Sequence, residues 1–308
     1  MVKREKWGKY FIKNIIRCKY LYIMFLPGFA YYIIFNYGPM YGAQIAFRDF
    51  NAYEGFWNSP WVGFKHFEAF FNNPYFFRLL RNTLTISISN LLFGFPAPII
   101  LALLLNEVRK NWVKRSMQTL LYLPHFISQV VVCGMIIWFT SLRGGVINNL
   151  ITTFGGEAVH FMAQPKWFVP VYVISGIWEN IGWGSIVFLA ALAGIAPSLY
   201  EAAIVDGAGK FNRMIHITLP SILPTIIIMF IMRMGNMFSV GHSKILLLYN
   251  PATYETADVI STYVYRRGML GADFSFSSAV DLFNSLCDFI LIVIFNKISQ
   301  KIGETSLW

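Results

Sequence analysis

Four ionisable residues lie inside otherwise apolar runs of the sequence: Glu179, Arg233, Asp281 and Asp288. A charged side chain at the centre of a membrane helix costs about 2.5 to 3.5 kcal/mol, so it usually faces other protein or a water-filled cavity. Arg233, with Asn236 three residues further on, can donate two parallel hydrogen bonds to a carboxylate. It can equally pair with Asp281 or Glu179 and hold helices together. Asn284 lies close to one helical turn beyond Asp281, which predicts that both face the same cavity.

A second group of polar and aromatic residues is Trp178-Glu-Asn-Ile-Gly-Trp-Gly184. The indole rings of Trp178 and Trp183 can stack on sugar rings, while Glu179 and Asn180 can form hydrogen bonds with hydroxyl groups. The same residues can instead form a network between helices, with the tryptophans at a membrane interface. The residue types leave both interpretations open.

Motifs for catalysis are missing from the sequence. Gly207-Ala-Gly-Lys210 superficially resembles a phosphate-binding loop, but Ile204 stands where that pattern requires Gly, and Phe211 stands where it requires Ser or Thr. No zinc pattern, nucleophile elbow or kinase motif set is present, and the three cysteines do not have metal-ligand spacing. We therefore expect no catalytic residue, no metal site and no cofactor bound by this chain.

The composition indicates which elements must position these residues. The 308 residues are 56% hydrophobic and 13% charged, whereas soluble domains are about 25% charged. A large soluble core is therefore disfavoured, and the 18% aromatic content suits the two interfaces of a lipid bilayer. The net charge of +10 is dispersed between apolar runs and forms no groove-sized patch, which argues against a nucleic-acid partner. The expected fold class is an all-α integral membrane protein.

Each membrane-spanning helix needs roughly 20 predominantly apolar residues. By this criterion the sequence predicts about six spans, at residues 20–42, 82–105, 117–141, 168–193, 216–238 and 276–297. The first apolar run has no clear cleavage site and is expected to be a retained anchor. Prolines inside several runs predict bent helices in a tightly packed bundle. No repeat or linker divides residues 20–297, which we take as one membrane domain.

Lysine and arginine residues are concentrated in alternate connections, which predicts the orientation of the chain. One side carries the basic N-terminal segment 1–19, the connections 106–116 and 194–215, and the tail 298–308. Both termini are therefore expected in the cytoplasm. Within the first segment, Phe11, Ile12, Ile15 and Ile16 alternate with lysines at helical spacing, which fits either an interfacial helix or a simple topogenic charge cluster.

The connection from Pro197 to Pro220 has the most specific pattern. Ser198 and Glu201 have the spacing of a capping box, which predicts a helix starting after Ser198. Asp206 and Gly207 then predict a break, followed by a second helical stretch that leads to Pro220. The pattern indicates a short helix-turn-helix between two spans.

This connection resembles the EAA signature of ABC-importer permeases: Glu201-Ala202-Ala203, Gly207, Ile217 and Leu219-Pro220 occupy the signature positions. The resemblance implies a type I importer fold in which residues near 198–209 form a coupling helix that docks in a cleft of the ATPase. It assigns this contact to six residues: Glu201, Ala202, Ala203, Asp206, Gly207 and Ala208. The small alanines permit close approach, and Glu201 can meet a basic residue or hold the cap.

Further segments are similar to the carbohydrate-importer permeases related to the maltose transporter. They are Trp61-Val-Gly-Phe-Lys-His-Phe67, Arg81-Asn-Thr83 and Gly145-Val-Ile-Asn148. The stretch Tyr249–Arg266 resembles a subgroup that imports complex oligosaccharides, including acidic pectin- and alginate-type fragments. In related permeases, the helix region that corresponds to Trp178–Gly184 lines the substrate cavity.

The resemblance implies a multi-pass subunit of a bacterial cell membrane complex that moves solute but does not catalyse. Its expected partners are a second permease, two ATPase subunits that bind ATP and Mg, an extracytoplasmic solute-binding protein, and an oligosaccharide. The residues expected along the substrate pathway are Trp178, Glu179, Asn180, Trp183, Arg233, Asn236, Asp281 and Asn284. The alternatives are a permease for another solute, a secondary transporter, which would need internal ion sites, and a membrane enzyme, which the missing catalytic motifs disfavour.

Overall fold

The computed structural model describes residues 14, 16–303 and 306, and within them the protein is helical, without a named strand. Most of the basic N-terminal segment lies outside these residues, so the interfacial helix expected there is not addressed. Five continuous helical stretches are long and apolar enough to cross a membrane: Lys19–Phe47, Phe76–Asn106, Pro165–Ala193, Lys210–Met234 and Phe274–Lys301.

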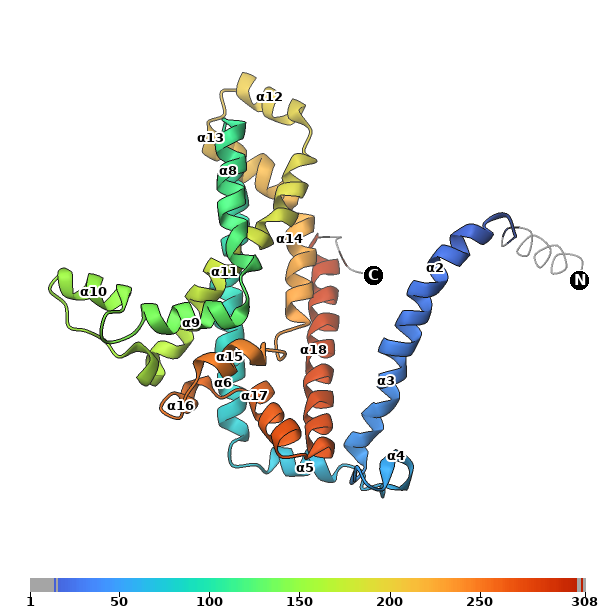
Figure 1. The fold of residues 1–308 in the computed structure, drawn as a ribbon. Coiled ribbons are helices and arrows are strands. Elements are labelled where there is room, and N and C mark those ends of the chain that lie inside the picture. Colours follow the sequence, from blue (N-terminus) through green and yellow to red (C-terminus); the bar gives the residue numbers. More distant parts are fainter. Residues whose placement is uncertain (1–13, 15, 304–305, 307–308) are drawn as a thin grey trace, which may run out of the picture.

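These stretches run alternately between two ends of the molecule (Figure 1). The first contains α2 (Lys19–Tyr32), η1 (Ile33–Tyr37), α3 (Gly38–Met40) and η2 (Tyr41–Phe47). The second contains α6 (Phe76–Ser89), η3 (Asn90–Gly94) and α7 (Pro96–Asn106), and the others are α11 (Pro165–Ala193), α13 (Lys210–Arg213) with η6 (Met214–Thr218) and α14 (Leu219–Met234), and α18 (Phe274–Gly303). Short helices occupy the connections: α4 (Gly55–Asn58), α5 (Lys65–Phe71), α10 (Val146–Thr153), η5 (Phe161–Ala163), α12 (Pro197–Val205), α15 (His242–Leu248), α16 (Tyr254–Ala257), α17 (Ile260–Val264) and η7 (Tyr265–Leu270).

The stretch predicted as a span at 117–141 is not straight: it is divided by a sharp bend. Residues Asn111–Phe126, which form α8 (Asn111–Tyr122) and η4 (Leu123–Phe126), meet α9 (Gln129–Phe139) at 98°. Ile127 and Ser128 are extended, and the Ser128 hydroxyl accepts a hydrogen bond from the backbone N–H of Val131 at 3.5 Å. Serine at this position starts a new helix. The described chain thus has five spans, or six if the bent pair counts as one.

Buried apolar side chains join the helices in three clusters. Ile99 and Ala102 of α7 meet Phe188 and Leu192 of α11 and Ile222 of α14. A second cluster joins α9, α11 and α15, and a third joins α5, α6 and α18 around Phe70 and Phe276. By contrast, α2 has no buried residue and stands apart from the bundle (Figure 1).

The expected helix-turn-helix lies at one end of the bundle, but its first helix does not start as predicted. α12 begins at Pro197 after the extended residue Ala196, and no side chain caps it, so the predicted capping role of Ser198 is wrong. Proline suits the first helical position because its φ is already helical, and it forces the preceding residue to be extended.

The end of α12 is as predicted, because Gly207 has a positive φ of 77°. The N–H of Ala208 donates to the Ala203 carbonyl at 2.8 Å, and the N–H of Gly207 donates to the Ile204 carbonyl at 3.0 Å. This is the Schellman pattern that ends many helices. The second helical stretch leads to Pro220 as predicted and continues into α14 through the π-helical turn η6. Such a turn accommodates the backbone N–H that proline lacks.

Candidate substrate cavity and coupling surface

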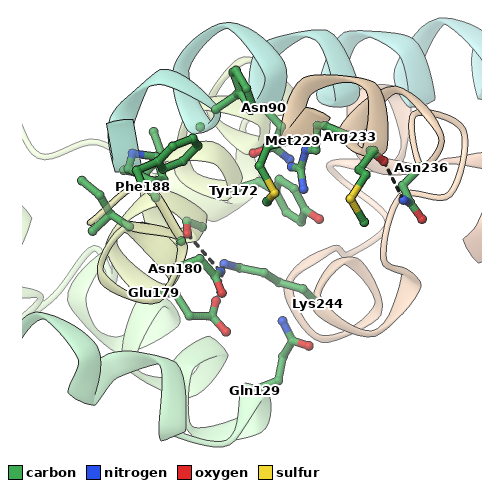
Figure 2. Close-up of a pocket in the computed structure, with 18 residues that line it drawn as sticks. Asn90, Gln129, Tyr172, Glu179, Asn180, Phe188, Met229, Arg233, Asn236 and Lys244 are labelled. Atoms are coloured by element: carbon green, nitrogen blue, oxygen red, sulfur yellow. Dashed lines mark hydrogen bonds and ion pairs between the residues drawn. The ribbon is translucent and has the colours of Figure 1, made fainter. Parts of the chain in front are cut away.

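A cavity of about 530 Å³ lies between α11, α14, α15 and the η3–α7 region (Figure 2). Four of the eight predicted pathway residues line it: Glu179, Asn180, Arg233 and Asn236. The remaining lining is Asn90, Gly94, Phe95, Pro98, Gln129, Tyr172, Gly176, Ile177, Ile181, Gly184, Phe188, Met229, Met232 and Lys244. The mixture of amides, charges, aromatic rings and methionines can bind both the hydroxyl groups and the apolar faces of a solute.

Lys244 is a charged residue of this cavity that was not singled out from the sequence. Its ammonium Nζ lies 3.0 Å from Glu179 Oε2, and the two side chains are 6% and 12% exposed. The same Nζ lies 5.5 Å from the centre of the Tyr172 ring, in reach of a cation–π contact. In Figure 2, Lys244 extends from α15 towards α11. The sequence signal was the apolar run Ile-Leu-Leu-Leu directly after this lysine, which a solvated loop would not need.

Arg233 has a different environment, because no ion pair forms with it in the described part of the chain. Of the two partners considered for it, Glu179 is paired with Lys244 instead. Arg233 also lines a second cavity of about 190 Å³, and Asn90, Tyr172 and Asn236 border both cavities with it. Figure 2 shows the guanidinium beside Tyr172, on the other side of the cavity from Glu179.

The two predicted tryptophans lie elsewhere on α11. Trp178 lines an apolar cavity of about 480 Å³ between α9, α10 and α11. Trp183 stacks on His125 of η4, with ring centres 4.6 Å apart and planes 7° apart. His125 Nδ1 lies 3.1 Å from Asn180 Oδ1, so the stack holds the bend of the broken span against α11. The structure thus places both indoles outside the 530 Å³ cavity, with 43% of Trp178 and 46% of Trp183 exposed.

The predicted residues of α18 do not line this cavity either. Asp281 is exposed in the isolated chain, whereas Asn284 is 6% exposed, so the two do not share an environment as predicted. Asp288 accepts hydrogen bonds at 2.8 Å from the Phe238 N–H and the Ser239 hydroxyl. It therefore fixes the chain after α14 against α18.

Three further polar residues of the cavity were not singled out from the sequence: Asn90, Gln129 and Tyr172. Asn90 starts the π-helical turn η3 within a span, and Gln129 starts α9 directly after the bend. Irregular turns in membrane helices often mark functional positions. The available sequence signal was a polar amide, Asn90 or Gln129, inside an apolar run.

The six predicted coupling residues lie together on α12 and its C-terminal turn, at one end of the bundle (Figure 1). Glu201, Ala202, Asp206 and Gly207 are exposed, while Ala203 and Ala208 are half-buried. Exposed apolar side chains accompany them, with Ile204 57% and Val205 86% exposed. This surface combines small, acidic and apolar groups on one short helix.

The Tyr249–Arg266 stretch is held by a buried carboxylate. Asp258, 1% exposed, accepts two hydrogen bonds of 2.8 Å from Arg266. Burial acts to lower the pKa of Arg266, but hydrogen bonds with Tyr249 and Asp258 outweigh it and keep that pKa above its usual value. The side-chain amide of Asn82 donates to the Asp258 carbonyl at 2.9 Å. The Arg81-Asn-Thr83 and Tyr249–Arg266 segments therefore contact each other and connect α6 to the 235–273 connection.

Comparison with known proteins agrees with this architecture. Residues 94–302 match the family described as binding-protein-dependent transport system inner membrane component. Protein LplB of Bacillus subtilis (strain 168) is 49% identical over 292 residues, which cover 95% of this chain and 92% of that protein. The polygalacturonan/rhamnogalacturonan transport system permease protein YteP of the same organism is 44% identical over 306 residues, covering 99% and 95%.

A solved structure also resembles the whole chain. It is a crystal structure of a bacterial alginate ABC transporter in complex with an alginate pentasaccharide-bound periplasmic protein, and one of its chains matches with a TM-score of 0.87 and 44% identity. The match covers 96% of this chain and 99% of that one. The expected importer-permease fold is therefore confirmed, and the chain belongs to the family of binding-protein-dependent transport system inner membrane components.

Proposed function

We propose that this chain is the permease subunit of an ATP-driven importer and forms part of the pathway of an oligosaccharide. The observation that carries the proposal is the combination, in one helical bundle, of a cavity of about 530 Å³ lined by both polar and apolar residues with an exposed α12 at one end. The relatives support the solute class, because YteP is named for polygalacturonan and rhamnogalacturonan transport, and the similar solved structure is of an alginate transporter.

In this proposal α12 docks on a separate ATPase subunit, which binds ATP and Mg and supplies the free energy. A second permease completes the pathway, two ATPase subunits drive it, and an extracytoplasmic binding protein delivers the solute. Residues 20–297 form the permease domain in the bacterial cell membrane, and residues 1–19 and 298–308 lie in the cytoplasm. This chain binds no cofactor and catalyses no reaction.

The connections of α12 to two membrane spans provide the means by which a separate ATPase switches the pathway between its inward and outward states. It joins α11 directly to the α13–α14 stretch, and both of these spans line the cavity. The Tyr200 hydroxyl lies 3.0 Å from the Thr218 hydroxyl, which ties α12 to the start of the second stretch. A displacement of α12 by the ATPase is therefore expected to move two walls of the cavity together.

Gly207→Asp tests the coupling role. The substitution places a bulky anion at the end of the docking helix and strains a backbone with φ of 77°. We expect less ATPase to co-purify with the variant, together with a sharp loss of uptake, while membrane insertion is retained. Gly155→Asp is the matched control, because Gly155 has a similar φ of 81°, has nothing within 4 Å of an added Cβ, and lies in the α10–α11 connection. Unchanged ATPase recovery and uptake in Gly207→Asp would contradict the assignment.

A further inference from the structure

The charges around the cavity do not cancel. Among the described residues that line it, the charged side chains are Glu179, Lys244 and Arg233. Glu179 and Lys244 neutralise each other in an ion pair of 3.0 Å. Arg233 therefore leaves one positive charge in excess, and in the adjoining 190 Å³ cavity it is the charged member of an otherwise neutral lining.

The position of Arg233 makes this charge available to a solute. It lies in the last turn of α14, and its side chain is exposed to the cavity in this chain. The partial negative charge of a helix C-terminus favours a cation there, but it offers no carboxylate for the guanidinium N–H groups. A guanidinium presents a planar pair of donors that matches a carboxylate in geometry and charge.

We propose that Arg233 is the receptor for a carboxylate of the transported solute, so that the cavity prefers acidic over neutral sugar units. This inference rests on the proposed function, and it specifies the chemistry of the solute. Asn90, Tyr172 and Asn236 border the same position and supply amide and hydroxyl groups for the ring hydroxyls of the sugar. Lys244 is unsuited to the role because its charge is already matched by Glu179 and its side chain is buried.

The two cavities meet at Arg233, so the proposed carboxylate site lies at the junction between them. Asn90, Tyr172, Arg233 and Asn236 belong to both linings. The smaller cavity extends to Ser239, Val240 and Gly241, whereas the larger extends along α11 to Phe188, which lies nearer to α12 in the chain. A carboxylate at Arg233 therefore lies where a solute passes from one cavity to the other.

The test is equilibrium binding of trigalacturonate, and of its neutral methyl ester, to the purified transporter complex without binding protein. We expect the wild type to bind the acid about ten-fold more tightly than the ester, the size of one charge-assisted hydrogen-bonded contact. Arg233→Gln should remove this preference with normal complex yield. Arg233→Lys should keep part of it, because the charge remains but the bidentate geometry is lost. Arg143→Gln, at an exposed site in another connection, is the control.

Equal binding of acid and ester by the wild type overturns the inference, and so does an Arg233→Gln variant that retains the preference. A fall in complex yield with Arg233→Gln beyond that of the control also overturns it, because it indicates that Arg233 pairs with a carboxylate of the second permease. ATP-driven uptake of trigalacturonate by wild-type proteoliposomes is measured separately. Absence of the preference in the wild type, with ATP-driven uptake intact, refutes only the carboxylate site, whereas absence of ATP-driven uptake refutes the proposed function.

Discussion

The ion pair between Lys244 and Glu179 in the cavity wall is buried, and its burial determines its energetic role. Both side chains are at least 88% buried by area, since 6% and 12% remain exposed. Taking two charges out of water is costly, so such a pair adds little net stability compared with apolar residues. Removing one partner is different, because the other charge is then buried without compensation.

Lys244→Met should therefore destabilise the complex by roughly 3 kcal/mol, measured as a lower thermal unfolding midpoint. The double variant Lys244→Met with Glu179→Leu should recover part of the loss, because no unpaired charge remains. Lys65→Met is the control: Lys65 lies 2.8 Å from Asp49 and its hydrogen bond lowers the pKa of that carboxyl, but the two side chains are 59% and 51% exposed. Its loss should change stability by less than about 1 kcal/mol. Equal effects of the two lysine variants would contradict the structural role of the buried pair.

Individual residues of the cavity could be predicted only where they lay inside a recognisable span. Glu179, Asn180, Arg233 and Asn236 stand out because polar groups are conspicuous in an apolar run. Lys244 was not singled out, because its position between two predicted spans suggested a solvated connection. The 235–273 connection instead packs α15 against α9, which buries this lysine beside α11. Whether a loop folds back into the bundle depends on contacts between residues that are far apart in the sequence. The spacing of residue types within one segment does not predict those contacts.

At the scale of the elements, the bend between η4 and α9 is fixed by a close approach of α8 to α11. A Cβ added at Gly182 of α11 would overlap the backbone carbonyl of Leu121. The absence of a side chain there lets the two helices touch, as small residues do in membrane helix packing. One residue further along α11, the Trp183–His125 stack continues the same contact.

Gly182→Ala is expected to separate α8 from α11 and to destabilise the protein by about 1 to 3 kcal/mol, the usual cost of overpacking. This exceeds the gain in helix propensity, which is at most about 1 kcal/mol. Gly134→Ala provides the control, because it lies in α9 with nothing within 4 Å of the added Cβ. That variant should unfold at the same temperature as the wild type or slightly above it. A Gly182→Ala variant as stable as Gly134→Ala would show that the contact is loose.

The sequence predicted the existence of the long helices better than their internal geometry. An apolar run of sufficient length indicates a helix that can cross the hydrocarbon core of a membrane. It does not indicate where the chain turns within that run. Ser128 had the residue type of a helix start, yet it lay inside a run apolar enough to conceal the 98° break. Gly207 was predictable as a helix end because a positive φ is a local requirement. Pro197, not Ser198, determined where α12 begins.

For the whole molecule, large apolar surfaces remain exposed in the isolated chain. α2 buries none of its residues, and Leu21, Met24 and Phe25 are 71%, 82% and 62% exposed. A water-soluble monomer does not expose such a surface. In the proposed assembly, lipid and the second permease cover this surface. Hydropathy could therefore identify the span in the sequence, but no contact within the described chain fixes where α2 lies relative to the bundle.

The distribution of basic residues predicts which end of the bundle faces the cytoplasm. α12 and the start of α13 lie at one end, and the connection between η2 and α4 lies at the other (Figure 1). The lysines and arginines of segments 1–19, 106–116 and 194–215 favour the cytoplasm for the α12 end. Tyr53, 100% exposed, is at the opposite end and should face outwards.

Single-cysteine labelling in intact cells decides the orientation, after Cys18, Cys133 and Cys287 have been replaced by serine or alanine. We expect a cysteine at Lys210 to react with a membrane-impermeant maleimide only after the cells are permeabilised, because α13 starts beside α12, the helix proposed to dock on the ATPase. A cysteine at Tyr53 should react in intact cells, which controls for reagent access. Reaction of the Lys210 cysteine from outside would reverse the topology, and since an ATPase in the cytoplasm could then not reach α12, it would remove the coupling assignment as well.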